Sequence, residues 1–136
     1  MPTLSISSEK VCYLIVKARE FDVQDLGADE DSGSNAADDR MIDVLEAHAD
    51  NPVVEEITTF IAEMSDDEKA DLMAMMQLGR GDGTMEDWEA LRDEAFREHS
   101  GRVAAYLMGH PLLSDYLEEG LSQFGFSCAE FEMGRL

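Results

Sequence analysis

The chain has 136 residues, and its 31 acidic against 10 basic side chains give a formal net charge of −21. Proteins bind nucleic acid largely through Lys and Arg side chains that displace counterions from phosphates, so this charge argues against direct binding to DNA, RNA or an anionic membrane surface. The length fits one domain, and a hydrophobic content of 44% is enough to build a core despite the charge.

The first predicted helix leads into an acidic loop. Ser7 or Ser8 can cap this helix. Its apolar face recurs at helical spacing in Val11, Leu14, Ile15, Ala18 and Phe21. Residues 22–38, rich in Asp, Gly, Ser and Ala, predict a mobile acidic loop. They belong to a longer acidic block, residues 20–56, which carries thirteen acidic residues and a single base.

The middle of the chain predicts three helices. A short helix covers residues 39–48, and a second begins at Pro52, because proline suits the first helical turn. The third opens with a capping box, Ser-Asp-Asp-Glu at residues 65–68, and is expected to stop at Gly79.

The remaining sequence predicts three further helices and a tail. One helix starts at Thr84, a short one covers residues 101–108, and the last has apolar residues at helical spacing over 113–124. No stretch alternates as a strand would. We therefore expect an all-α fold, a compact bundle of about six or seven short helices. It would form one domain over residues 1–125, followed by a loosely ordered C-terminal tail at 126–136.

The two cysteines carry little information in the sequence. Cys12 and Cys128 lie far apart, and neither falls in a C-x-x-C or metal-type spacing. No disulfide framework is implied, which fits a reducing compartment. The longest strongly apolar stretch, residues 11–16, is too short to span a bilayer. We expect a cytoplasmic protein that does not enter the membrane.

Residues 78–89 are the most informative candidate site. Aligned with the twelve-residue calcium loop of an EF-hand, they place Asp82 at position 5, Gly83 at the sharp turn of position 6 and Glu89 at position 12. Positions 1 and 3 need carboxylates but hold a leucine and Arg80. Losing two oxygen ligands and gaining a fixed cation should abolish useful calcium affinity, so we expect neither a metal nor a cofactor.

The alternative interpretation of this segment is a structural corner between two helices. Its glycines supply unusual dihedral angles, and Thr84 caps the following helix. In this hypothesis Arg80 does part of the work of the missing cation, with its guanidinium held by Asp82 or Glu89. Arg80, Asp82 and Glu89 are therefore the candidate residues of a ligand-binding or structural loop.

Several segments resemble a known family. They are residues 4–12, 17–22, 78–82 (Leu-Gly-Arg-Gly-Asp) and 116–125. Together they resemble a family of small uncharacterised bacterial proteins, catalogued as a domain of unknown function. The resemblance implies a bacterial, cytoplasmic, helical protein, and it implies no activity, cofactor or catalytic residue.

Enzyme chemistry has weak support. His48, His99 and His110 are isolated, and no metal-ligand spacing, G-x-S-x-G motif, P-loop or dinucleotide fingerprint occurs. We therefore predict no catalytic residue, although a small hydrolase stays open if His and carboxylate side chains converge at a pocket. The methionines around residues 64–85 predict core packing, with an adaptable groove for partner helices as the alternative.

The leading functional expectation is a non-enzymatic interaction or regulatory protein that binds a basic protein partner. The acidic block would steer the encounter, and a patch lined by Met and aromatic residues would supply affinity. A stronger version is mimicry of nucleic-acid phosphates. The alternatives are an ion- or small-ligand-binding module at residues 78–89 and a small hydrolase. An apolar helix face can serve a core or a dimer equally, so the oligomeric state stays open.

Overall fold

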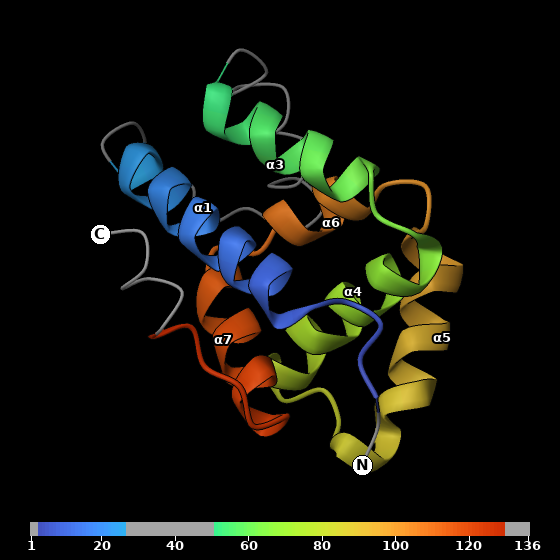
Figure 1. The fold of residues 1–136 in the computed structure, drawn as a ribbon. Coiled ribbons are helices and arrows are strands. Elements are labelled where there is room, and N and C mark those ends of the chain that lie inside the picture. Colours follow the sequence, from blue (N-terminus) through green and yellow to red (C-terminus); the bar gives the residue numbers. More distant parts are fainter. Residues whose placement is uncertain (1–2, 27–50, 130–136) are drawn as a thin grey trace.

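The computed structural model describes residues 3–26 and 51–129, and in these residues the chain is helical (Figure 1). The elements are α1 (Ser8–Leu26), α3 (Pro52–Ala62), α4 (Asp66–Arg80), the 3-10 turn η2 (Met85–Asp87), α5 (Trp88–His99), α6 (Val103–Met108) and α7 (Leu113–Gln123). The described residues contain no strand, which confirms the predicted all-α bundle.

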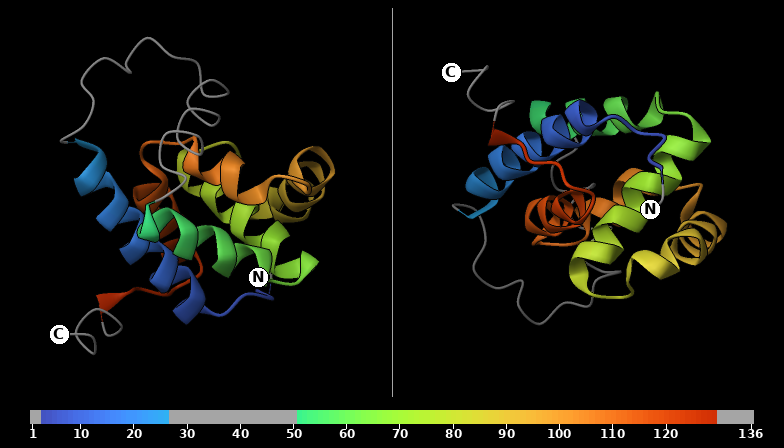
Figure 2. Two further views of the ribbon diagram at one scale, coloured as in Figure 1. Left: turned by 90° about the horizontal axis from the view of Figure 1, so that it is seen from above. Right: turned by 60° about the horizontal axis from the view of Figure 1, so that its bottom comes forward.

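Helix α4 forms the centre of the bundle. It packs against α7 on one side and α5 on the other, while α1 lies against α7 and α3, and α3 also contacts α6 (Figures 1 and 2). Residues 72–76, Leu-Met-Ala-Met-Met, are fully buried. The prediction that these methionines pack in the core is therefore confirmed, and they cannot line an exposed patch for a partner. Trp88 is also buried, with its ring edge-on to Phe124 at 4.8 Å between centroids.

The helix starts follow the local signals in the sequence. Asn51 caps α3 by accepting a 2.8 Å hydrogen bond from the backbone N–H of Val53. At the start of α4, the Glu68 N–H donates to Ser65 Oγ at 3.2 Å, and the Ser65 N–H donates to Glu68 Oε1 at 2.9 Å. The predicted capping box is thus confirmed.

The predicted end of α4 at Gly79 is wrong. The helix continues to Arg80, and Gly81 caps it in the left-handed conformation, with φ +95°. Gly79 instead lies where α7 crosses closely, because a Cβ there would stand 1.8 Å from the carbonyl oxygen of Tyr116. Gly120 of α7 faces α4 in the same way, since its Cβ would stand 2.3 Å from the carbonyl oxygen of Met75.

The first residues of the acidic loop predicted at 22–38 are helical instead, over 22–26. Helix α1 continues through Leu26, and the sequence offers no glycine or proline before Gly27 to end it. The rest of that loop and the helix predicted at 39–48 lie outside the described residues.

The cysteines correct a further expectation, that no disulfide is present. Cys12 on α1 and Cys128 after α7 form a disulfide with 5.5 Å between their Cα atoms, and both side chains are buried. Gly125, with φ +88°, turns the chain after α7, and the following residues return to α1. Within the tail predicted at 126–136, the described part therefore includes a buried, covalently held residue, while residues 130–136 lie outside the described residues. A pairing across 116 positions has no local signal in the sequence.

In the described part of the chain, none of the helices combines the length and the apolar character that a membrane span requires.

Candidate functional site

The predicted site at residues 78–89 is a corner between two helices. The N–H of Gly81 donates to the carbonyl oxygens of Gln77 and Leu78, each at 3.1 Å, which closes the last turn of α4. Thr84 then precedes η2, and its N–H donates to Asp87 Oδ2 at 2.9 Å. The corner thus has a glycine at the C-cap of α4 and a short turn after Thr84, in which the Asp87 carboxylate accepts hydrogen bonds from Thr84.

Arg80 folds back onto Asp82 within this corner. Its Nε and Nη2 donate to the same carboxylate oxygen of Asp82, at 2.9 and 2.5 Å. The hydrogen bond to Asp82 raises the pKa of Arg80 further above its ordinary value. Glu89, the other predicted partner, lies near Arg92 instead, with 3.4 Å between Oε1 and Nη1. The structure therefore brings together Arg80 and Asp82 but not Glu89.

His110 joins Arg80 from the far side, although the two residues are thirty positions apart. Its Nε2 lies 2.6 Å from Arg80 Nη1, and its Nδ1 lies 2.9 Å from the carbonyl oxygen of Tyr106. Because a guanidinium can only donate, Nε2 must accept, and Nδ1 must carry the proton that is donated to Tyr106. His110 is thus held as a neutral imidazole. Burial and the Arg80 charge both lower its pKa below the ordinary value.

Tyr106 of α6 is the centre of this arrangement. Its hydroxyl accepts a 2.9 Å hydrogen bond from Gln77 Nε2 of α4. Its ring stacks on His99 at the end of α5, with 3.8 Å between centroids, and meets His110 edge-on at 5.1 Å. We call Gln77, Arg80, Asp82, Tyr106 and His110 the Arg80 cluster. Two of the histidines thus converge on one tyrosine, and only the four-residue spacing from Tyr106 to His110 hinted at this. His48 lies outside the described residues.

The chemistry of the Arg80 cluster favours a structural role. Its charged groups already bond to one another, and the guanidinium beside Asp82 repels a second cation. Among the described residues, no group of three or more His, Cys, Asp or Glu side chains is placed to hold a metal. The cavity next to His110, which Asp22 also lines, measures about 10 Å³, room for roughly one water molecule. The cluster ties the end of α4 to the end of α6.

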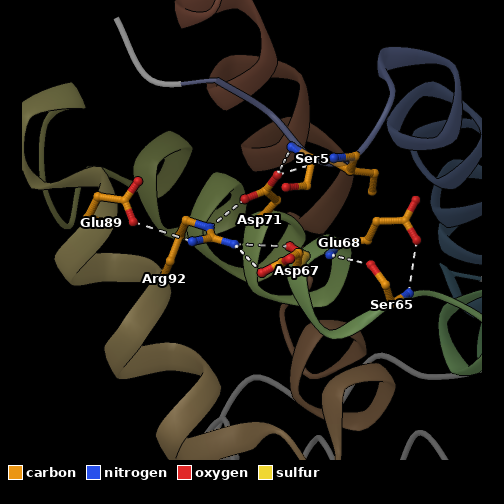
Figure 3. A network of polar contacts seen from close by, with 8 residues as sticks. Ser5, Ser65, Asp67, Glu68, Asp71, Glu89 and Arg92 are labelled. Carbon is orange, nitrogen blue, oxygen red and sulfur yellow. Dashed lines mark hydrogen bonds and ion pairs between the residues drawn. The ribbon is translucent and has the colours of Figure 1, made fainter.

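A second polar network surrounds a buried carboxylate that sequence reasoning missed (Figure 3). Asp71 of α4 is fully buried, and its Oδ2 accepts from the backbone N–H groups of Ser5 at 2.5 Å and Ile6 at 3.2 Å. Its Oδ1 accepts from Arg92 Nε of α5 at 2.6 Å. The Arg92 guanidinium also reaches the exposed carboxylate of Asp67 at 3.3 Å. One carboxylate therefore holds the N-terminal segment, α4 and α5 together.

Residues 54–126, more than half of the chain, match the family model described as "Protein of unknown function (DUF3775)". The chain belongs to this family. The matched region takes in nearly all of α3 and the whole of α4 to α7, so it contains the Arg80 cluster and the Asp71–Arg92 pair. Cys12 and Cys128 both lie outside it. No curated protein and no solved structure matches the chain.

Membership of the family confirms the resemblance that the sequence suggested. The family description assigns no activity, so it transfers no role to Arg80, Asp82 or Glu89. Any function must be argued from this molecule's own surface.

Proposed function

We propose that this protein is a non-enzymatic interaction or regulatory protein that binds a basic protein partner through an acidic surface. The observation that carries the proposal is the pairing of its cations. Five of the described basic side chains each form an ion pair with a carboxylate of the same chain: Lys10, Lys17, Arg19, Arg80 and Arg92. The excess of carboxylates is left on the surface, where it attracts positive partners over several ångströms.

Part of the acidic surface lies along α5 and the start of α4. Glu89, Asp93 and Glu94 are exposed on α5, and Asp66 and Asp67 are exposed at the first turn of α4. We call these five residues the acidic face. The acidic block at 20–56, which was expected to steer the partner, lies largely outside the described residues.

A groove of about 240 Å³ runs between the two halves of the acidic face. Asp66, Asp67 and Asp93 line it together with the half-buried Phe96, and Arg92 and Arg97 line it as well. Carboxylates beside an aromatic ring suit a Lys or Arg side chain, because the ring face attracts a cation that the carboxylates hold in place. This groove supports a specific docking point rather than charge attraction alone.

The test compares two double variants that remove the same charge from different helices. Asp93→Asn with Glu94→Gln removes two of the five charges of the acidic face, and Glu55→Gln with Glu63→Gln removes the charges of two exposed residues at α3. Each bait is incubated with lysate of the native cells and washed across a salt series. We expect one basic protein to be retained stoichiometrically by the unchanged bait and by the α3 variant, and to be lost by the α5 variant and at high salt.

Two results would contradict the acidic face as the docking surface. The first is that the amount of captured protein does not fall as the salt concentration rises. The second is that both double variants reduce it equally. Competition by DNA for the captured protein would separate phosphate mimicry from ordinary docking. Calorimetry with calcium, magnesium and manganese tests the remaining ligand-binding hypothesis at Arg80 and Asp82, for which we expect no heat.

The cellular setting belongs to the proposal as well. The family resemblance favours a bacterial cytoplasm, whereas disulfides persist mainly in oxidising compartments. Protein taken from native cells, quenched in acid, denatured and alkylated should carry two modified cysteines if the cytoplasmic assignment holds. Recovery of an intact Cys12–Cys128 bond would place the protein in an oxidising compartment instead.

A further inference from the structure

A second groove, of about 330 Å³, lies between the end of α3, the first turn of α4 and the connection from α5 to α6. Helix α3 contributes Thr58 and Ile61, α4 contributes Lys69, and the α5–α6 connection contributes Ser100 and Arg102. These three segments and the start of α6 all lie in the matched family region and meet at one hollow, so several helices rather than a single loop position it.

The charge of this groove is opposite to that of the molecule. Among the described residues that line it, Lys69 and Arg102 are basic and none is acidic, although the chain has three times as many acids as bases. Neither cation forms an ion pair with any residue in the described ranges, in contrast to the five paired cations above. Lys69 is half-buried and Arg102 is exposed, so the groove presents two cations without a paired carboxylate among the described residues.

The other lining groups define what could fill the groove. The hydroxyls of Thr58 and Ser100 can donate hydrogen bonds, and the side chains of Ile61 and Val103 offer an apolar wall. A guanidinium and an ammonium on one hollow match a carboxylate or a phosphate, since Arg can bind either through two parallel hydrogen bonds. The volume lies at the lower end of the range for small-molecule sites.

We propose that this groove binds a small organic anion, with a carboxylate or phosphate monoester head held by Lys69 and Arg102 and a short apolar body lying against Ile61 and Val103. The site is distinct from the acidic face, because the two surfaces share no residue and select opposite charges. The proposal replaces the small-ligand hypothesis at residues 78–89, where Arg80 and Asp82 pair with each other, by a groove in which Lys69 and Arg102 form no ion pair with the described residues.

The test uses simple probes on the full chain. Hexanoate and hexyl phosphate supply the two head groups, hexanol supplies the tail without charge, and inorganic phosphate supplies a head without a tail. Binding is followed by titration in nitrogen-15 NMR spectra. We expect the amides of Ala62, Gly101 and Ala104 to shift with hexanoate or hexyl phosphate, and with neither hexanol nor inorganic phosphate at the same concentration.

Variants separate this groove from general charge effects. Lys69→Gln and Arg102→Gln should each weaken binding of the responding anion about tenfold or more, as expected for the loss of a charged hydrogen bond. Arg97→Gln is the matched control, because Arg97 is an exposed cation of α5 that lines the groove of the acidic face and not this one, and it forms no ion pair with any residue of the described ranges. It should bind as the unchanged protein does, and circular dichroism verifies that all three variants are folded.

Three results would overturn the proposal. The first is the absence of shifts with both anions at millimolar concentration. The second is an equal response to hexanol, which would make the hollow a site for apolar tails alone. The third is equal weakening by Arg97→Gln and by the two groove variants, which would reduce the effect to net charge.

Discussion

At the scale of single residues, the two polar networks differ in how much they should contribute to stability. Asp71 and Asp67 both contact Arg92, but the Asp71 side chain is 1% exposed and the Asp67 side chain 78% exposed. Removing one partner of a buried pair leaves an uncompensated charge in the interior, whereas an exposed pair exchanges its partner for water.

Asp71→Ala should therefore lower the free energy of unfolding by about 3–5 kcal/mol. The change leaves Arg92 without its buried partner, and it also removes the acceptor of the backbone N–H groups of Ser5 and Ile6. Asp67→Ala is the control with the same cationic partner, and it should cost at most about 1 kcal/mol. Urea unfolding of both variants measures the difference. Similar losses would mean that the buried carboxylate is no more important than the exposed one.

His110 should make stability depend on pH. Its pKa in the folded protein lies below its ordinary value of 6.5, first because of burial and second because of Arg80. The unfolded chain therefore binds a proton on this residue that the folded protein resists, so stability is fully present above pH 6.5 and falls as the pH drops toward the folded pKa. Protonation would also turn Nε2 from an acceptor into a donor facing Arg80.

The measurement compares unfolding free energies between pH 8 and pH 5.5 for the unchanged protein and for His110→Gln. The variant should lose less stability on acidification, because it lacks this titrating group. The carboxylates are common to both proteins, so the difference between the two curves isolates His110. Parallel curves would assign the acid sensitivity to other groups.

At the scale of elements, the crossing of α4 and α7 is set by two glycines. Gly79→Ala and Gly120→Ala each place a methyl group against backbone of the opposing helix, and backbone cannot move aside as a flexible side chain can. Each change should cost about 1–3 kcal/mol, as overpacking does. Gly101→Ala is the control, because a Cβ there meets nothing within 4 Å. Thermal unfolding should show no more than a small shift for it, and an equal shift for all three would contradict the close crossing.

The same glycines show which features of the fold could be predicted from sequence. The caps at Asn51 and Ser65 were predictable because their hydrogen bonds span two or three residues. A glycine that ends a helix and a glycine that admits a neighbouring helix look alike along the chain, so Gly79 was assigned the role that Gly81 plays. Only the position of α7 distinguishes the two.

In the candidate site too, contacts between residues close in sequence could be predicted, and contacts between distant residues could not. Arg80 and Asp82 are two residues apart, and their pairing followed from local sequence. His110 is 30 positions from Arg80 and Ser5 is 66 positions from Asp71, so both contacts depend on the tertiary arrangement of the helices. Asp71 also lies in a helix that is buried on nearly every side, where apolar periodicity gives no guidance.

At the scale of the whole molecule, stability rests on packing and on one covalent link that opposes a large net charge. The charge of −21 destabilises the folded state through repulsion between its carboxylates. The Cys12–Cys128 disulfide closes a loop of 116 positions and lowers the conformational entropy of the unfolded chain, which favours folding.

Cys128→Ser should lower the free energy of unfolding by about 2–4 kcal/mol relative to the oxidised protein. The buried position of both sulfur atoms adds to the effect, since a hydroxyl replaces a packed apolar group. Reduction of the disulfide in the unchanged protein should lower the free energy of unfolding by a similar amount. The reductant should not change the stability of the variant. Urea unfolding with and without dithiothreitol measures both, and a variant as stable as the oxidised protein would show that the link adds nothing.

The position of that link also decides what a protease can release. Because the bond joins α1 to the segment that follows α7, every peptide bond between residues 12 and 128 belongs to a closed ring. A single cut anywhere in the ring opens it without separating any piece. A nicked molecule would therefore run as one species until reductant is added, and it could lose a surface connection without losing any of its helices.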